Sequence, residues 1–109
     1  MKRKDDKAEP FPDPPGHLSD RSKDLWRTLG PTEVGSIERL TLFQAALESL
    51  DRADEARRTV AIEGMTFTTK GTGAVHVHPL LKTEREMRSQ FTRIWDVLNL
   101  RWKKGLEGF

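Results

Sequence analysis

Residues 64–81 read GMTFTTKGTGAVHVHPLL, and they interrupt a chain whose other patterns are helical. Two short runs in which apolar and polar residues alternate, 65–69 and 74–77, flank a glycine-containing turn at 70–73. Alternation of this kind around a glycine turn predicts a β-hairpin. Pro79 follows directly, and because proline favours the first turn of a helix, a helix should begin there.

Two helices are predicted before the hairpin. Ser19 is a good N-cap for a first helix, which the Gly-Pro pair at 30–31 should end. Ser36 can cap a second helix that runs to about Glu63 and stops at Gly64. Its apolar positions recur every three or four residues, which is helical spacing. These positions are Ile37, Leu40, Phe43, Leu47, Leu50, Ala53, Ala56 and Val60.

A third helix should run from about Pro79 to Asn99. One stripe of it is apolar, with Glu84 as a polar break and Trp95 alongside. The stripe consists of Leu80, Met87, Phe91, Ile94 and Leu98, and its spacing resembles that of a coiled coil. The predicted fold is therefore mainly α: a helix, a long helix, a β-hairpin and a long helix. The two long helices should form an antiparallel pair with the small hairpin at one end.

The chain of 109 residues is long enough for one domain. Residues 1–16 are charged and then rich in proline, so we expect a flexible N-terminal arm. Residues 17–100 should form the helical domain, and residues 101–109 a basic C-terminal tail.

The composition points to self-association. Only 35% of the residues are hydrophobic and 33% are charged, which is thin for an isolated core of this size. We therefore expect a homo-oligomer, in which other subunits cover part of the apolar surface. The expected interface comprises nine residues of the two long helices: Leu40, Phe43, Leu47, Leu50, Met87, Phe91, Ile94, Trp95 and Leu98.

Several classes of protein are disfavoured. The chain has no cysteine, which excludes disulfides and thiolate chemistry. No apolar run is as long as a membrane span, and no signal-peptide core follows the N-terminal charges, so we expect a soluble intracellular protein without a membrane partner. We find no nucleophile motif and no cofactor motif, and we expect no enzymatic activity and no cofactor.

The hairpin contains the residues that come closest to a chemical motif. His76 and His78 should point to the same face of a strand and could share a metal, but no third ligand is evident, so we predict no metal site. The stretch KGTG at 70–73 has its lysine before the glycines, unlike a phosphate-binding loop, and is interpreted as a turn. The acidic residues of 51–55 are interpreted as a solvated helix face, with Arg52 and Arg58 as partners.

Clusters of basic residues are the candidates for contact with nucleic acid phosphates. Trp102 lies within the last of these clusters and could stack on a base or dock on a protein. The formal net charge is only +2, so any DNA contact must come from local clusters. The candidate DNA-binding residues are Lys2, Arg3, Lys4, Arg57, Arg58, Lys70, Arg101, Lys103 and Lys104.

The order of these segments resembles that of a known family. The stretches PPGHLSDRSKDLWRTL, ERLTLFQAALESLDRADEARRTVAIEG, HVHPLL and FTRIWDVLNL follow one another between about residues 14 and 100. In this order they are similar to the small terminase subunit of tailed phages, in its short helical branch. The family often closes its last helix with leucine-glycine-leucine, followed by threonine-proline and an arginine. Here Asn99 stands at the glycine, and RWKK at 101–104 replaces the rest.

The resemblance implies a non-enzymatic subunit that assembles into a ring. Members of the family bind double-stranded viral DNA at the packaging-initiation site, and they load and regulate the large terminase subunit, which holds the ATPase and nuclease. They work in the cytoplasm of the infected bacterium. Two other interpretations remain open: a small helical protein-interaction or DNA-binding regulator of phage or plasmid origin, and a metal-dependent enzyme using His76 and His78.

Overall fold

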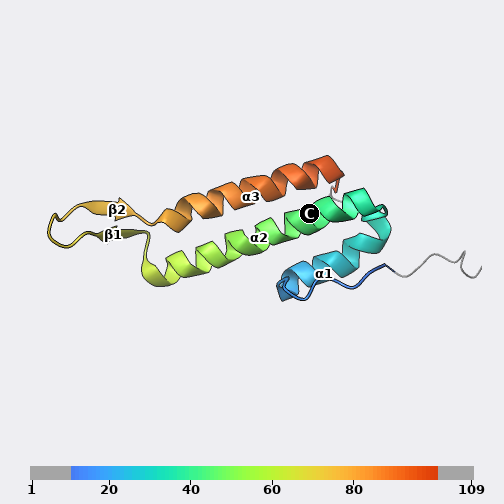
Figure 1. The fold of residues 1–109 in the computed structure, drawn as a ribbon, viewed down its shortest axis with the longest axis horizontal. Helices are drawn as coiled ribbons and strands as arrows, with labels where there is room; N and C mark the ends of the chain where they lie inside the picture. Colours follow the sequence, from blue (N-terminus) through green and yellow to red (C-terminus); the bar gives the residue numbers. More distant parts are fainter. Residues whose placement is uncertain (1–10, 101–109) are drawn as a thin grey trace, which may run out of the picture.

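The computed structural model describes residues 11–100, and within them the predicted order of elements is confirmed. Figure 1 shows α2 and α3 running antiparallel, side by side, with α1 beside the first part of α2 and the hairpin projecting from the opposite end. The elements are α1 (Asp20–Leu29), the π-helical turn η2 (Gly30–Val34), α2 (Ile37–Glu63), β1 (Thr66–Thr68), β2 (Val75–Val77) and α3 (Pro79–Leu98).

The predicted helix starts are confirmed, because the caps form as expected. The hydroxyl of Ser19 accepts a hydrogen bond of 3.1 Å from the amide of Ser22. The hydroxyl of Ser36 accepts one of 3.2 Å from the amide of Arg39. These bonds satisfy amides that have no partner inside the helix. At the other end of α2, Gly64 adopts a φ of 92°, which a residue with a side chain rarely does, and the helix stops there.

The first helix ends where the prediction placed its stop, because α1 finishes at Leu29 with Gly30 as its C-cap. The short π-helical turn η2, which the sequence did not predict, follows from Gly30 to Val34. Pro31 lacks the amide hydrogen of a regular helical residue, so the helix cannot continue with α-helical bonding. Arg39 holds the last two carbonyls of the turn with hydrogen bonds of 2.8 Å each, and Gly35, with a φ of 83°, ends it.

The proline-rich segment also differs from the prediction, since residues 11–16 pack against α1 and are not a free arm. The indole nitrogen of Trp26 donates a hydrogen bond of 2.8 Å to the carbonyl of Pro12. The rings of Phe11 and Trp26 are 5.7 Å apart, and the Phe11 ring leaves no room for a side chain at Gly30. The buried aromatic surface therefore extends the helical domain to residue 11. The arm prediction for residues 1–10 and the tail prediction for 101–109 lie outside the described residues.

The core lies where α1, η2 and the adjoining ends of α2 and α3 meet. Phe43 is its centre, with ring centroids 5.8 Å from Trp26 and 6.1 Å from Trp95. Ile37, which was predicted to lie on the apolar face of α2, is instead 72% exposed. Its position at the start of the helix precedes the part of α2 that faces the core. The buried core residues are Leu18, Trp26, Val34, Phe43, Leu47, Leu98 and Leu100.

The β-hairpin is confirmed and extends away from this core. Thr66 pairs with Val77, Phe67 with His76 and Thr68 with Val75. Two glycines of the connecting turn have positive φ, in agreement with the turn predicted at 70–73. The molecule is elongated, with extents of 74 × 34 × 20 Å. None of the helices in residues 11–100 combines the length and apolar character of a membrane span.

Candidate functional site

The candidate DNA-binding residues that the structure describes lie in the half of the molecule that carries the hairpin. Arg57 and Arg58 are exposed on α2, and Lys70 is exposed in the hairpin turn. None of the three forms an ion pair with another residue of 11–100. The other six candidates, Lys2, Arg3, Lys4, Arg101, Lys103 and Lys104, lie outside the described residues, as does Trp102.

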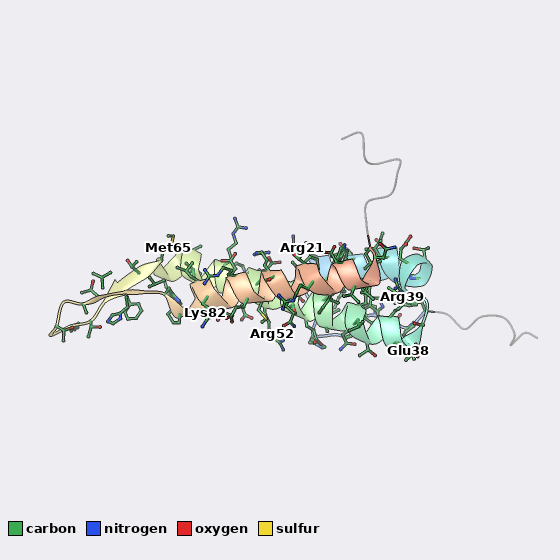
Figure 2. All side chains as sticks on the ribbon, turned by 90° about the horizontal axis from the view of Figure 1, so that it is seen from above. Arg21, Glu38, Arg39, Arg52, Met65 and Lys82 are labelled. Atoms are coloured by element: carbon green, nitrogen blue, oxygen red, sulfur yellow. The ribbon has the colours of Figure 1, made fainter. Side chains whose placement is uncertain are left out.

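Arg85 is a further basic residue of this half, and the sequence analysis did not single it out. It is exposed on α3 and forms no ion pair within the described part of the chain. Its neighbour Lys82 is different, since its amine lies 3.8 Å from the Glu86 carboxylate, one helical turn away. Figure 2 shows Lys82 and Met65 towards the hairpin end, with Arg39 and Glu38 at the other. Arg57, Arg58, Lys70 and Arg85 are called the distal basic set below.

Other arginines are committed to structural contacts and are unavailable to a ligand. Asp54 on α2 pairs with Arg21 of α1 and, at 3.3 Å, with Arg88 of α3. Arg88 also lies 3.1 Å from Glu84, so the polar break in the α3 stripe has a partner. Asp54 thus joins all three helices, and its interpretation as part of a solvated helix face is wrong.

Asp51 is likewise a structural residue. Its carboxylate accepts hydrogen bonds of 2.6 Å from the hydroxyls of Ser19 and Ser22, and one of 2.8 Å from the Ser19 amide. These groups lie at the start of α1, where the helix dipole favours a negative charge. Ser22 is fully buried, and the carboxylate is the nearer acceptor of its hydroxyl, at 2.6 Å against 3.5 Å for the Leu47 carbonyl. Asp51 therefore docks α1 on α2.

The two histidines of the hairpin are occupied by neighbouring protein groups. The ring of His76 stacks on Phe67, with centroids 5.1 Å apart. His78 accepts a hydrogen bond of 3.1 Å at Nδ1 from the Leu80 amide, and its Nε2 lies 2.7 Å from a carboxylate oxygen of Glu63. Within residues 11–100 there is no group of three or more histidine, cysteine, aspartate or glutamate side chains that could hold a metal ion.

His78 therefore has a structural role that the sequence analysis missed. It caps α3 and ties the end of α2 to the start of α3, at the base of the hairpin. The signal was present in the sequence, because a residue directly before a helix-starting proline occupies the N-cap position. Its carboxylate partner could not be predicted, since Glu63 approaches only after the hairpin has turned the chain back.

The predicted oligomer interface divides into two groups. Phe43, Leu47, Leu50 and Leu98 are at most 6% exposed, and the chain itself covers them. Assigning these four residues to contacts between copies was wrong, because other helices of the same chain already enclose them. The other five residues, Leu40, Met87, Phe91, Ile94 and Trp95, are half-buried and leave part of their surface open.

Comparison with known proteins finds no matching protein-family model, no matching curated protein and no matching solved structure. The surface features of residues 11–100 are therefore the basis for an argument about function. Two of them stand out: the distal basic set and the exposed β-hairpin.

Proposed function

We propose that this chain is a small terminase subunit of a tailed phage, which binds viral DNA and regulates the large packaging subunit without catalysing a reaction itself. The observation that supports this most is the order of the elements. The structure contains a capped helix, a long helix ending at Gly64, a hairpin closing at the His-Pro junction and a helix ending before Asn99, and this order is compatible with the resemblance.

The end of α3 adds support at Asn99, one of the two places where the sequence departs from the family pattern. Asn99 adopts a left-handed conformation, with φ 60° and ψ 40°. Glycine adopts this conformation most readily, and asparagine is the other residue that commonly does so at a helix end. Asparagine at position 99 therefore adopts a conformation that a glycine there could also adopt, and this substitution is compatible with the proposal. The second departure, RWKK at 101–104, lies outside the described residues.

The distal basic set supports the DNA-binding part of the proposal. Four exposed cations without ion pairs in the described part of the chain can neutralise phosphates without first breaking a structural contact. Each copy brings only a few charges, but several copies in one assembly would act together and raise the apparent affinity. The proposed partners are thus double-stranded viral DNA, the large subunit and further copies of this chain, in the host cytoplasm.

The test is an ATPase and DNA-packaging assay with the cognate large subunit. The isolated chain should neither hydrolyse ATP nor cleave DNA, and its addition should change ATP turnover or direct cleavage to one viral site. A matched variant, Arg57→Ala/Arg58→Ala, should weaken this effect in proportion to its loss of DNA binding. If turnover, cleavage and packaging are all unchanged by the wild-type chain, the terminase proposal is wrong.

The alternative is a small helical regulator that binds a protein or DNA in a phage or plasmid. The exposed apolar side chains of the hairpin favour this alternative, since exposed apolar surfaces commonly bind other proteins. The same assay separates the two proposals, because a regulator of this kind would bind its target without altering the large subunit.

A further inference from the structure

The β-hairpin carries apolar side chains on both of its faces. Residues that pair across an antiparallel ladder share a face, and alternate residues along a strand point to opposite faces. Phe67, opposite His76, lies on one face with Met65, whose carbonyl continues the ladder to the His78 amide at 2.8 Å. We call this the aromatic face.

The opposite face is formed by the remaining pairs, in which Thr66 meets Val77 and Thr68 meets Val75. We call it the valine face. Val75 and Val77 are 68% and 65% exposed, and on the aromatic face Met65 is 62% and Phe67 49% exposed. Both faces of the hairpin are therefore exposed. Figure 1 shows the reason, because the hairpin projects beyond the ends of α2 and α3.

A hairpin of this kind would be stabilised by a partner that covers its faces. Two strands without a third strand or a packed layer are marginally stable in water. Each strand also has an outer edge, and the strands contain neither proline nor a charged side chain, which are the usual protections of an exposed edge. Four large apolar side chains, two on each face, are 49–68% exposed and together present an area on the order of several hundred Å². This area is divided between two contacts, so other parts of the chain must supply the rest of the ~800 Å² per partner in a stable interface.

The chemistry of the hairpin favours a protein surface over DNA. Lys70 is the only lysine, arginine, aspartate or glutamate in residues 64–78, and it lies in the turn, away from both strands. Protein surfaces that bind DNA are polar and strongly positive. The two faces of the strands instead carry apolar side chains with threonine and histidine, and no lysine or arginine. Two such hairpins can approach one another closely with little repulsion.

We propose that the hairpin joins copies of this chain, with the aromatic face of one copy packed on the valine face of the next. Two unlike faces on opposite sides of one element form a head-to-tail contact, which repeats from copy to copy and closes into a ring where the rotation permits. In such an arrangement each hairpin has two neighbours, and both faces are covered. The inference rests on the homo-oligomer of the proposed function and names the surface that builds it.

The test uses one variant for each face, at tens of micromolar protein, measured by native mass spectrometry. Phe67→Asp places a charge on the aromatic face, and Val75→Asp places one on the valine face. Thr72→Asp is the matched control, because Thr72 is exposed in the turn and an aspartate oxygen can replace its hydroxyl as acceptor for the Ala74 amide. The wild type and Thr72→Asp should be oligomeric, and each face variant should raise the dissociation constant of the oligomer more than tenfold.

Mixing the two face variants provides the decisive measurement. Phe67→Asp retains an intact valine face and Val75→Asp an intact aromatic face, so an equimolar mixture should form a one-to-one dimer that neither variant forms alone. A variant whose hairpin had merely unfolded could not do this. The two chains differ in mass, so the mixed dimer can be identified directly.

Each other outcome overturns the inference in a distinguishable way. If both face variants assemble like the wild type, the contact lies elsewhere and the proposed oligomer stands. If they are monomeric but the mixture does not pair, the two-face arrangement is wrong. If the wild type is a monomer, both the hairpin contact and the proposed oligomer are wrong. If Thr72→Asp also dissociates the oligomer, the assignment of the contact to the two strand faces is wrong. If assembly depends on both faces but the large subunit is unaffected, the terminase proposal fails and this inference stands.

Discussion

Asp51 shows how one side chain decides the position of a helix. Its carboxylate accepts hydrogen bonds from Ser19 and from the fully buried Ser22, at the start of α1. Asp51→Ala would leave the Ser22 hydroxyl without this acceptor and remove a favourable charge from the helix start. We expect the free energy of unfolding to fall by about 2–3 kcal/mol. Denaturant unfolding of the variant measures this.

The control for Asp51 is a neighbouring acid without such contacts. Glu55 is exposed on the same helix, and Glu55→Ala should change the free energy of unfolding by less than about 0.5 kcal/mol. Equal effects of the two substitutions would mean that helix charge, and not the docking of α1, is what matters.

Glu48 makes the free energy of unfolding depend on pH in the acidic range. A hydrogen bond of 3.0 Å from Gln44, and then one with His17 at 2.7 Å, lower the pKa of Glu48 from its ordinary 4.5. A group with a lowered folded-state pKa contributes stability that is fully present above its unfolded pKa. This contribution is lost as the pH falls below 4.5 and through the lower pKa of the folded state.

Glu48→Gln should therefore reduce the loss of stability in that acidic range. The measurement is the free energy of unfolding as a function of pH for wild type and variant, with the two curves separated at neutral pH and converging towards low pH. Curves that stay parallel from neutral pH to below pH 4.5 would show that Glu48 does not contribute to the acid response.

At the scale of the elements, Arg39 joins the ends of two helical segments. Its guanidinium donates to the last two carbonyls of η2, at 2.8 Å each, and to the Leu98 carbonyl at the end of α3, at 2.7 Å. Helix ends leave carbonyls without partners, and a cation there is favourable. Arg39→Met keeps much of the side-chain length and removes the donors, so we expect a loss of about 2–3 kcal/mol in unfolding free energy.

The matched control is Arg52→Met on the same helix, where the side chain is exposed and no ion pair is formed within the described chain. It should leave stability nearly unchanged. Arg39→Lys should recover only part of the loss, since one amine cannot reproduce the planar fork that reaches several carbonyls. Full recovery by lysine would show that charge alone, and not the bonding geometry, is responsible.

The elements were predictable where the signal is local. Ser19, Ser36 and Gly64 set helix ends through bonds and backbone angles within a few residues of themselves, so their chemistry could be seen in the sequence. Asp51 and Asp54 were misinterpreted because their partners are about thirty residues away or more. An acidic residue on a helix face has the same sequence pattern whether it meets water or a second helix.

For the proline-rich segment and the candidate site, too, local features could be predicted from the sequence and long-range contacts could not. Prolines correctly excluded a helix at 11–16, but the contact of this segment with Trp26 depends on the tertiary fold. The basic residues of the distal set could be named from the sequence, with the exception of Arg85. The sequence could not show which of the cations are free of ion pairs, because the ion pairs depend on how α1 and α3 approach α2.

At the scale of the whole molecule, the main aromatic core cluster and the distal basic set lie towards opposite ends of the long axis. The core cluster lies where α1, η2 and the ends of the long helices meet, and the distal basic set lies towards the hairpin end. A protein with this layout can change its distal surface by mutation without disturbing its core. The proposed DNA contact can therefore be tested with folded variants.

Arg57→Ala/Arg58→Ala is the sharpest of these tests. If both side chains contact phosphates, the slope of log affinity against log salt should become less steep by about 1.8, since each phosphate contact contributes about 0.9. The matched control, Arg27→Ala/Arg93→Ala, removes two exposed arginines from α1 and from the core end of α3, and should leave the slope unchanged. Fluorescence anisotropy with viral DNA over a range of salt concentrations measures the slope for both double variants.

If neither double variant alters the slope, the proposed DNA contact belongs to other basic residues, such as Lys70 or those at 2–4 and 101–104. If the wild type binds DNA without salt dependence, phosphate contacts are not the basis of its function, and the protein-binding regulator is the better proposal.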